Sequence, residues 1–101
     1  MFPRDVAEVF EREYGCTEAD WARCLPVAVR SHPLRVGAAG AAEVGIGAGT
    51  LALGWVVLPE RRIGLARLPR MRVSFRFHSV DAAARREFMR WFDLSMQRGG
   101  G

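Results

Sequence analysis

The chain has 101 residues, 50% hydrophobic and 26% charged, which fits one globular domain and excludes a disordered chain. Its net charge of +4 comes from arginine alone, as is typical of GC-rich bacterial coding, and ten of the 15 arginines lie in residues 61–101. Two cysteines exclude a disulfide framework, and there is no apolar leader and no apolar run long enough to span a bilayer. We therefore expect a cytoplasmic protein with no membrane partner.

The first third of the chain, residues 1–31, is expected to be helical. Apolar residues recur at helical spacing over 3–14 and predict a first amphipathic helix, which Gly15 ends. Thr17 and Asp20 resemble a capping box and predict a second helix, with a buried stripe at Trp21, Cys24 and Leu25. Pro26 should kink or end this helix, and the conformation of residues 27–31 is left open.

Residues 36–78 are expected to form an antiparallel sheet, because the apolar pattern changes there from helical to alternating. The predicted strands are 42–47, 50–58, 62–68 and 71–78, with turns at Ala48-Gly49, at 59–61 and at 69–71. This register places Leu65 opposite Phe75 and Ile63 opposite Phe77, so that the large apolar side chains share one face. The sequence thus predicts a four-stranded meander.

A last helix is expected over residues 81–97, with Phe88 and Phe92 on its apolar face and Asp81 as a cap. Residues 98–101 are expected to be a flexible tail. The predicted fold is a single α+β domain: two N-terminal helices, a four-stranded antiparallel meander, and a C-terminal helix on the apolar face of the sheet.

The opposite face of this sheet carries small residues and the predicted binding residues, Arg62, Arg72, Arg76 and His78. Guanidinium groups bind carboxylates and phosphates, so this cluster could hold a small anionic metabolite. His78 is the one candidate catalytic residue, as a proton shuttle near neutral pH. A solvated or subunit-contacting face would show the same pattern.

Other sites are weakly indicated. The cysteines are too widely spaced for a structural zinc site, and neither glycine-rich segment has the ending of a phosphate loop, so no metal or cofactor is expected. Cys16 precedes a helix start, where a thiol pKa can be lowered, so a Cys–His pair stays open. The aromatic residues share the apolar face rather than the arginine face, which is unlike a surface that stacks nucleic-acid bases.

Three functions remain, in order of preference. The first is a non-enzymatic binding or interaction module that forms a homodimer through the small-residue sheet face. The second is an enzyme or binding protein for a small anion, with His78 as proton shuttle and Arg72 and Arg76 as anchors. The third and least favoured is nucleic-acid binding.

Overall fold

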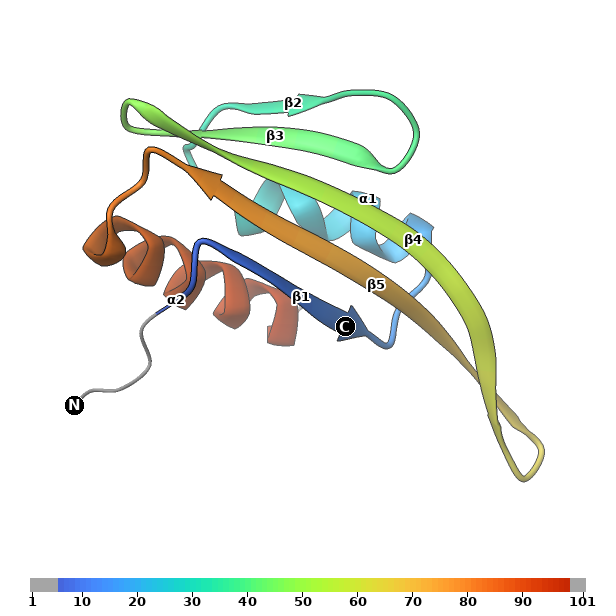
Figure 1. The fold of residues 1–101 in the computed structure, drawn as a ribbon. Coiled ribbons are helices and arrows are strands. Elements are labelled where there is room, and N and C mark those ends of the chain that lie inside the picture. Colours follow the sequence, from blue (N-terminus) through green and yellow to red (C-terminus); the bar gives the residue numbers. More distant parts are fainter. Residues whose placement is uncertain (1–5, 99–101) are drawn as a thin grey trace.

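A computed structural model describes residues 6–98 of the chain, with five strands and two helices (Figure 1). The strands are β1 (Val9–Tyr14), β2 (Leu34–Val36), β3 (Ala41–Ile46), β4 (Gly49–Ile63) and β5 (Ala66–His78). The helices are α1 (Glu18–Ala28), between β1 and β2, and α2 (Ala82–Arg98), after β5. The α+β class and the antiparallel sheet are as the sequence predicts.

All the strands form one antiparallel sheet in the order β1-β5-β4-β3-β2, so the first strand pairs with the last. The sheet curves around α1 and α2, which lie on the same side of it (Figure 1). We call the covered side the inner face and the other side the outer face. The core fills the inner face, where Trp21 and Leu25 of α1 and Phe88 and Phe92 of α2 are buried.

Strand β5 explains why the sheet has two unlike faces. Its C-terminal half alternates without interruption, which confirms the half-buried strand predicted there. On the inner face Met71, Val73, Phe75 and Phe77 are all buried, and the intervening residues are exposed. The rings of Phe75 and Phe77 meet Phe92 and Phe88 edge-on, with centroid distances of 5.6 and 6.2 Å.

The prediction of two N-terminal helices and a four-stranded sheet is wrong. Residues 9–14 of the first predicted helix form strand β1, residues 6–8 are neither helix nor strand, and residues 3–5 lie outside the described residues. Phe10 and Tyr14 are four positions apart and share a face in a helix and in a strand alike, so their spacing did not decide between the two. The open edge of β5 decides for a strand, because β1 pairs with it from Val9 opposite Arg76 to Tyr14 opposite Met71.

The predicted third strand does not exist as a separate strand. Instead β4 continues to Ile63 and β5 begins at Ala66, so one long hairpin replaces the two predicted turns. Two residues of β4, Pro59 and Glu60, lie opposite the single residue Pro69 of β5, as a bulge in the register. A bulge tolerates proline, which has no N–H to give to the ladder.

This correction moves the cross-strand pairs. Phe75 lies opposite Leu53, and Phe77 lies opposite Leu51, where the sequence predicted Leu65 and Ile63. The register between β3 and β4 differs from the predicted one by two residues, since Val44 pairs with Leu51. A shift by two keeps every side chain on its face, which is why the predicted inner face of these two strands survives.

Glycine residues determine where the turn between β3 and β4 lies. The turn from β3 to β4 is Gly47-Ala48, with Gly47 at a φ of 59°, rather than the predicted Ala48-Gly49. Gly49 instead begins β4, where a Cβ atom would lie 2.2 Å from the carbonyl oxygen of Ser79. Glycine is therefore required at 47 by backbone conformation and at 49 by close packing of two backbones.

Helix α1 begins as predicted, because the Thr17 hydroxyl accepts a hydrogen bond from the Asp20 amide at 3.1 Å. It passes through Pro26 and ends at Ala28, with Val29 as its C-cap, so it covers the first part of the undecided segment 27–31. Asp81 precedes α2 and accepts a hydrogen bond from the Ala84 amide at 2.8 Å. The predicted tail is helical at Arg98, and residues 99–101 lie outside the described residues.

Candidate ligand-binding groove

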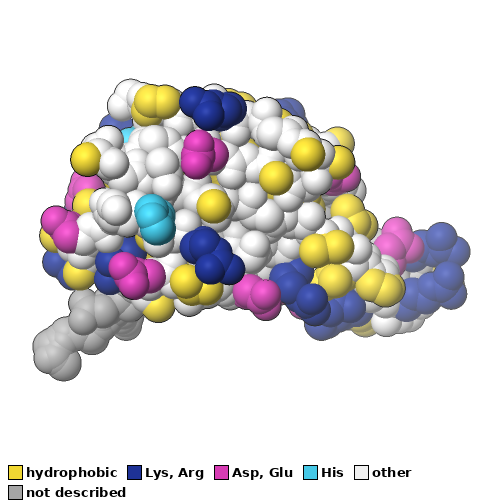
Figure 2. All heavy atoms as spheres, turned by 45° about the horizontal axis from the view of Figure 1, so that its top comes forward, with side chains coloured by type: hydrophobic (Ala, Val, Ile, Leu, Met, Phe, Trp, Pro, Cys, Tyr) yellow, Lys and Arg dark blue, Asp and Glu magenta, His cyan; other side chains and the backbone are white. Residues whose placement is uncertain are grey.

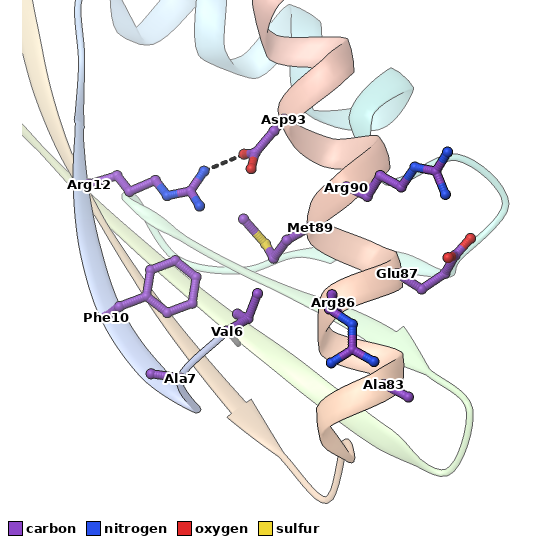
Figure 3. A pocket seen from close by; sticks show the side chains of 10 residues that line it. All are labelled: Val6, Ala7, Phe10, Arg12, Ala83, Arg86, Glu87, Met89, Arg90 and Asp93. Carbon is purple, nitrogen blue, oxygen red and sulfur yellow. Dashed lines mark hydrogen bonds and ion pairs between the residues drawn. The ribbon is translucent and has the colours of Figure 1, made fainter. Parts of the chain in front are cut away.

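A groove of about 900 Å³ lies between the N-terminal end of the sheet's edge strand β1 and helix α2 (Figure 3). Its size is within the usual range of small-molecule sites. Residues from segments far apart in the sequence line it: Val6, Ala7, Phe10, Arg12, Ala83, Arg86, Glu87, Met89, Arg90 and Asp93. The groove therefore exists only because β1 pairs with β5, the pairing that the helical prediction missed.

Arg85 holds the two walls of the groove together. Its Nε donates a hydrogen bond to the Val6 carbonyl at 2.8 Å, and its terminal nitrogen donates one to the Val80 carbonyl at 2.7 Å. The Glu8 carboxylate lies 3.9 Å from the same guanidinium. The segment before β1 is thereby tied to the start of α2 through backbone carbonyls, which fixes the width of the groove at this end.

The groove has an apolar floor. The Phe10 ring stacks on Phe75 with centroids 4.7 Å apart and planes 9° apart, so its exposed side faces the groove. Met89 points from α2 toward Phe10 (Figure 3) and is itself buried. Val6 and Ala7 continue this surface, so the floor offers apolar contact but few hydrogen bonds.

Arg12 and Asp93 close one end of the groove. They point toward each other across the gap and form an ion pair (Figure 3), with side chains 35% and 37% exposed. Burial lowers the pKa of Arg12, but the hydrogen bond and charge of Asp93 outweigh it and hold that pKa above its ordinary value. Arg12 is therefore a permanent cation, and its guanidinium also lies 5.3 Å from the Phe10 ring centroid.

A second cavity of about 340 Å³ lies on the other side of this ion pair, lined by Arg12, Tyr14, Asp93, Met96 and Gln97. The Tyr14 hydroxyl is buried beside the Arg12 guanidinium, which can donate to its oxygen, but within residues 6–98 its O–H has no acceptor. Burial raises the pKa of Tyr14, so the phenol stays protonated and keeps its donor. An unpaired buried hydroxyl is costly, and a ligand or water oxygen beside Arg12 would satisfy it.

The predicted anion cluster is only partly assembled. Arg72, Arg76 and His78 lie on the outer face of β5, with Ser74 between the two arginines, and all three are exposed. Arg62 lies apart from them, on the distal part of the hairpin, where it pairs with Arg67. Neither the groove nor the second cavity is lined by any of these four.

The neighbours of the three outer-face residues give no enclosure. Arg72 lies opposite Glu13 and Val56, and Arg76 lies opposite Val9 and Ala52. His78 pairs with Thr50 at the end of the strand. Figure 2 shows this side of the molecule, with charges of both signs scattered over it rather than gathered in a hollow.

The sequence contains one signal for the groove that the helical prediction obscured. In a strand, Arg12 falls on the same face as Phe10 and Tyr14, and a charge between two inward aromatics is unusual. Asp93 follows Met89 by one helical turn, so both face β1 from α2. If residues 9–14 had been predicted as a strand, Arg12 and Asp93 would have been expected to face each other.

The remaining chemical candidates are weak. Burial raises the pKa of the Cys16 thiol, which opposes a role as nucleophile. Within the part of the chain that the structure describes, no group of three His, Cys, Asp or Glu side chains is placed to hold a metal ion. None of the helices described has the length and apolar character needed to cross a bilayer.

The groove must be interpreted from its own residues. No family model, curated protein or solved structure matches this chain.

Proposed function

We propose that the chain is a non-enzymatic binding protein whose groove between β1 and α2 holds a small amphipathic anion. The observation that carries this proposal is a half-buried guanidinium at the end of an apolar groove. The apolar part of the ligand would lie on Phe10 and Met89, and its carboxylate or phosphate would reach Arg12.

Arg12 has the donors for this role. A guanidinium has five N–H donors in a fixed fork, and the Asp93 carboxylate accepts a bond from one terminal nitrogen. A ligand anion can therefore share Arg12 with Asp93 or displace it.

The lining favours binding over catalysis. Among the described residues that line the groove there is no histidine, cysteine or serine, and its two carboxylates, Asp93 and Glu87, are held by Arg12 and by the Trp91 indole N–H. General acid–base chemistry needs a group that can take or give a proton near neutral pH. The pKa of Arg12 is raised, which moves it further from that range.

A homodimer through the outer sheet face stays a prediction, and so does an anion site at Arg72, Arg76 and His78. The groove is preferred because it combines a cavity with a half-buried cation, whereas these outer-face residues are solvated. Fully exposed arginines bind single small anions weakly, since water screens the attraction.

The test is thermal unfolding and calorimetry with decanoate, a carboxylate with a flexible apolar chain, and with decanol as the uncharged control. Decanoate at about one hundred times its Kd should stabilise the native protein by about 2.7 kcal/mol. Arg12→Gln should abolish the effect, and decanol should give a smaller one.

The matched control is Arg76→Gln, which removes the same charge from the outer face. This variant should bind decanoate like the wild type. If Arg76→Gln abolishes binding and Arg12→Gln does not, the outer face is the anion site and the groove proposal fails. Because Arg12→Gln leaves Asp93 half-buried without its partner, the double variant Arg12→Gln/Asp93→Asn checks that any loss comes from the missing cation and not from unfolding.

A further inference from the structure

The distal part of the β4–β5 hairpin, residues 59–69, extends beyond the body of the molecule (Figure 1). We call these residues the arm. Helices α1 and α2 cover none of it in Figure 1, and most of its side chains are exposed. A two-stranded ribbon is marginally stable by itself in water, so the arm adds little to the stability of the fold.

The tip of the arm presents apolar residues to solvent. Gly64 and Leu65 form the two-residue turn, with Gly64 at a φ of 60°, as a type II′ turn requires of its first central residue. The second central position has no need for an apolar side chain, yet it holds Leu65, which is 104% exposed. Ile63, the residue before the turn, is 58% exposed.

Arginines surround this tip. Arg61, Arg62 and Arg67 lie within four residues of the turn, and Figure 2 shows arginine and hydrophobic side chains together on the arm. Arg62 and Arg67 are directly opposite each other, and like charges in that position destabilise a strand pair. An external anion between the two guanidinium groups would remove this repulsion. Binding to an anionic surface would therefore stabilise the ribbon.

A second copy of the chain does not offer that anionic surface. Almost every described carboxylate is already held within its own chain, by an arginine, an indole N–H or a backbone amide. Glu18, Asp81 and Glu87 accept bonds from uncharged N–H groups and keep their negative charge, and Glu60 lies on the arm itself. Glu18 lies on α1 and Asp81 and Glu87 lie at α2, so these carboxylates form no continuous anionic surface for the arm of a second copy.

Nucleic acid fits the charge of the arm but not its apolar part. The arm has no asparagine, glutamine, serine, threonine or aromatic residue, so it has no side chain to stack on a base and few to read one. Protein–DNA interfaces are polar and strongly basic, whereas here Ile63, Leu65 and Leu68 alternate with the arginines.

We propose that the arm docks on bilayers that contain anionic lipids. Leu65 and Ile63 would enter the boundary between headgroups and acyl chains, while Arg61, Arg62 and Arg67 would bind lipid phosphates. Arginine can bury its aliphatic stem and keep its guanidinium at the headgroups, which suits a cation so close to an apolar tip. This surface is separate from the groove, and the proposal does not rest on the groove's ligand.

The experiment is co-sedimentation of the full chain with unilamellar vesicles of phosphatidylcholine and phosphatidylglycerol in a ratio of about two to one, and with pure phosphatidylcholine vesicles. Wild type should bind the anionic vesicles and not the neutral ones. Arg62→Gln/Arg67→Gln should weaken binding at least about tenfold. Leu65→Ser/Ile63→Ser should weaken it by a similar factor without a change of charge.

Arg72→Gln/Arg76→Gln is the matched control, because it removes two exposed arginines from the outer face and leaves the arm intact. This variant should keep vesicle binding within about twofold of the wild type. All four exchanged arm residues are exposed, so unfolding curves should show that both arm variants fold like the wild type.

Four results would overturn the proposal: no binding to the anionic vesicles, an equal loss in the outer-face control, normal binding after Leu65→Ser/Ile63→Ser, or arm-dependent binding to duplex DNA alone. Arm-dependent dimers in native mass spectrometry without vesicle binding would likewise assign the arm to a second copy. Arg12→Gln should leave vesicle binding unchanged, so failure of the groove proposal and failure of this one remain distinguishable.

Discussion

The β4–β5 hairpin has two halves in opposite environments. In the proximal half, Leu53 and Phe75 lie opposite each other under the helices and are buried. In the distal half, the pair Ile63 and Ala66 has no layer over either face and is exposed. The same two strands therefore form the centre of the core and a bare arm.

This difference shows that apolar residues in a strand indicate burial only where a second layer exists to cover them. The helices have a limited reach: the aromatic residues Phe88 and Phe92 of α2 cover Phe77 and Phe75. Beyond Met71 the hairpin continues without them. In the arm, stability comes from backbone pairing and the turn, so mutations there should act on interactions with other molecules rather than on folding.

The largest effect should come from truncating the core half. Phe75 is 0% exposed, stacks on Phe10 and meets Phe92 edge-on, so Phe75→Ala should lower the free energy of unfolding by about 3–5 kcal/mol. Ile63→Ala removes exposed apolar surface from the arm and should change it by no more than about 0.5 kcal/mol. Urea unfolding with an unchanged m-value measures both. A comparable cost at Ile63 would mean that the arm is covered after all.

A smaller effect should distinguish the two glycines at the ends of β4, Gly49 at its start and Gly64 just after its last residue. At Gly49, a Cβ atom would lie 2.2 Å from the Ser79 oxygen and 2.4 Å from the His78 oxygen, so Gly49→Ala must push two backbones apart. The cost should be about 1–3 kcal/mol, as for an overpacked core. At Gly64 nothing lies within 4 Å, and only the positive φ opposes a side chain.

Gly64→Ala should therefore fray the arm and leave global unfolding within about 0.5 kcal/mol of the wild type. Hydrogen exchange would show this directly, as faster exchange of the arm amides with unchanged exchange in the proximal half. If Gly64→Ala lowers global stability as much as Gly49→Ala, the arm belongs to the same cooperative unit as the core.

The sequence correctly predicted those parts of the molecule in which the apolar residues follow either the strand spacing or the helix spacing, but not both. The faultless alternation from Met71 to His78 predicted which residues of β5 are buried, and the cap at Thr17 predicted the start of α1. Strand β1 was missed because Phe10 and Tyr14 satisfy both periods and the decisive partner, β5, lies about sixty residues away in the chain.

The arm was missed for a related reason. Pro59 and Pro69 were interpreted as parts of turns, since proline often ends a strand. They instead lie across from each other on β4 and β5, at the bulge between the two strands. Treating Leu65 as a core residue followed from that error. The groove could not be predicted without β1 in place, because Arg12 and Asp93 meet only through the tertiary fold.

The smallest effect should come from the ion pair where the body of the sheet gives way to the arm. Arg70 donates two hydrogen bonds to the Glu13 carboxylate, at 2.8 and 3.1 Å, and these hold the pKa of Glu13 below its ordinary value. A lowered native pKa means that the pair stabilises the fold above the ordinary pKa of Glu, and that this contribution is lost as the pH falls through the lowered value. Arg70→Gln should thus lower Tm slightly at neutral pH, and the difference should vanish in acid and at about 1 M salt.

Glu13→Gln is the matched variant, since it removes the carboxylate and keeps its shape. If the ion pair stabilises the fold, both variants should lose the same small amount of Tm at neutral pH. Neither variant should then show the loss of Tm in acid that the pair gives the wild type. Arg70 also donates to the Pro59 carbonyl at 3.4 Å, a contact that does not titrate. A Tm difference from the wild type that persists in acid for Arg70→Gln but not for Glu13→Gln would therefore assign the stabilisation to the Arg70–Pro59 contact. The body of the sheet would then anchor the arm through the backbone of Pro59 rather than through charge.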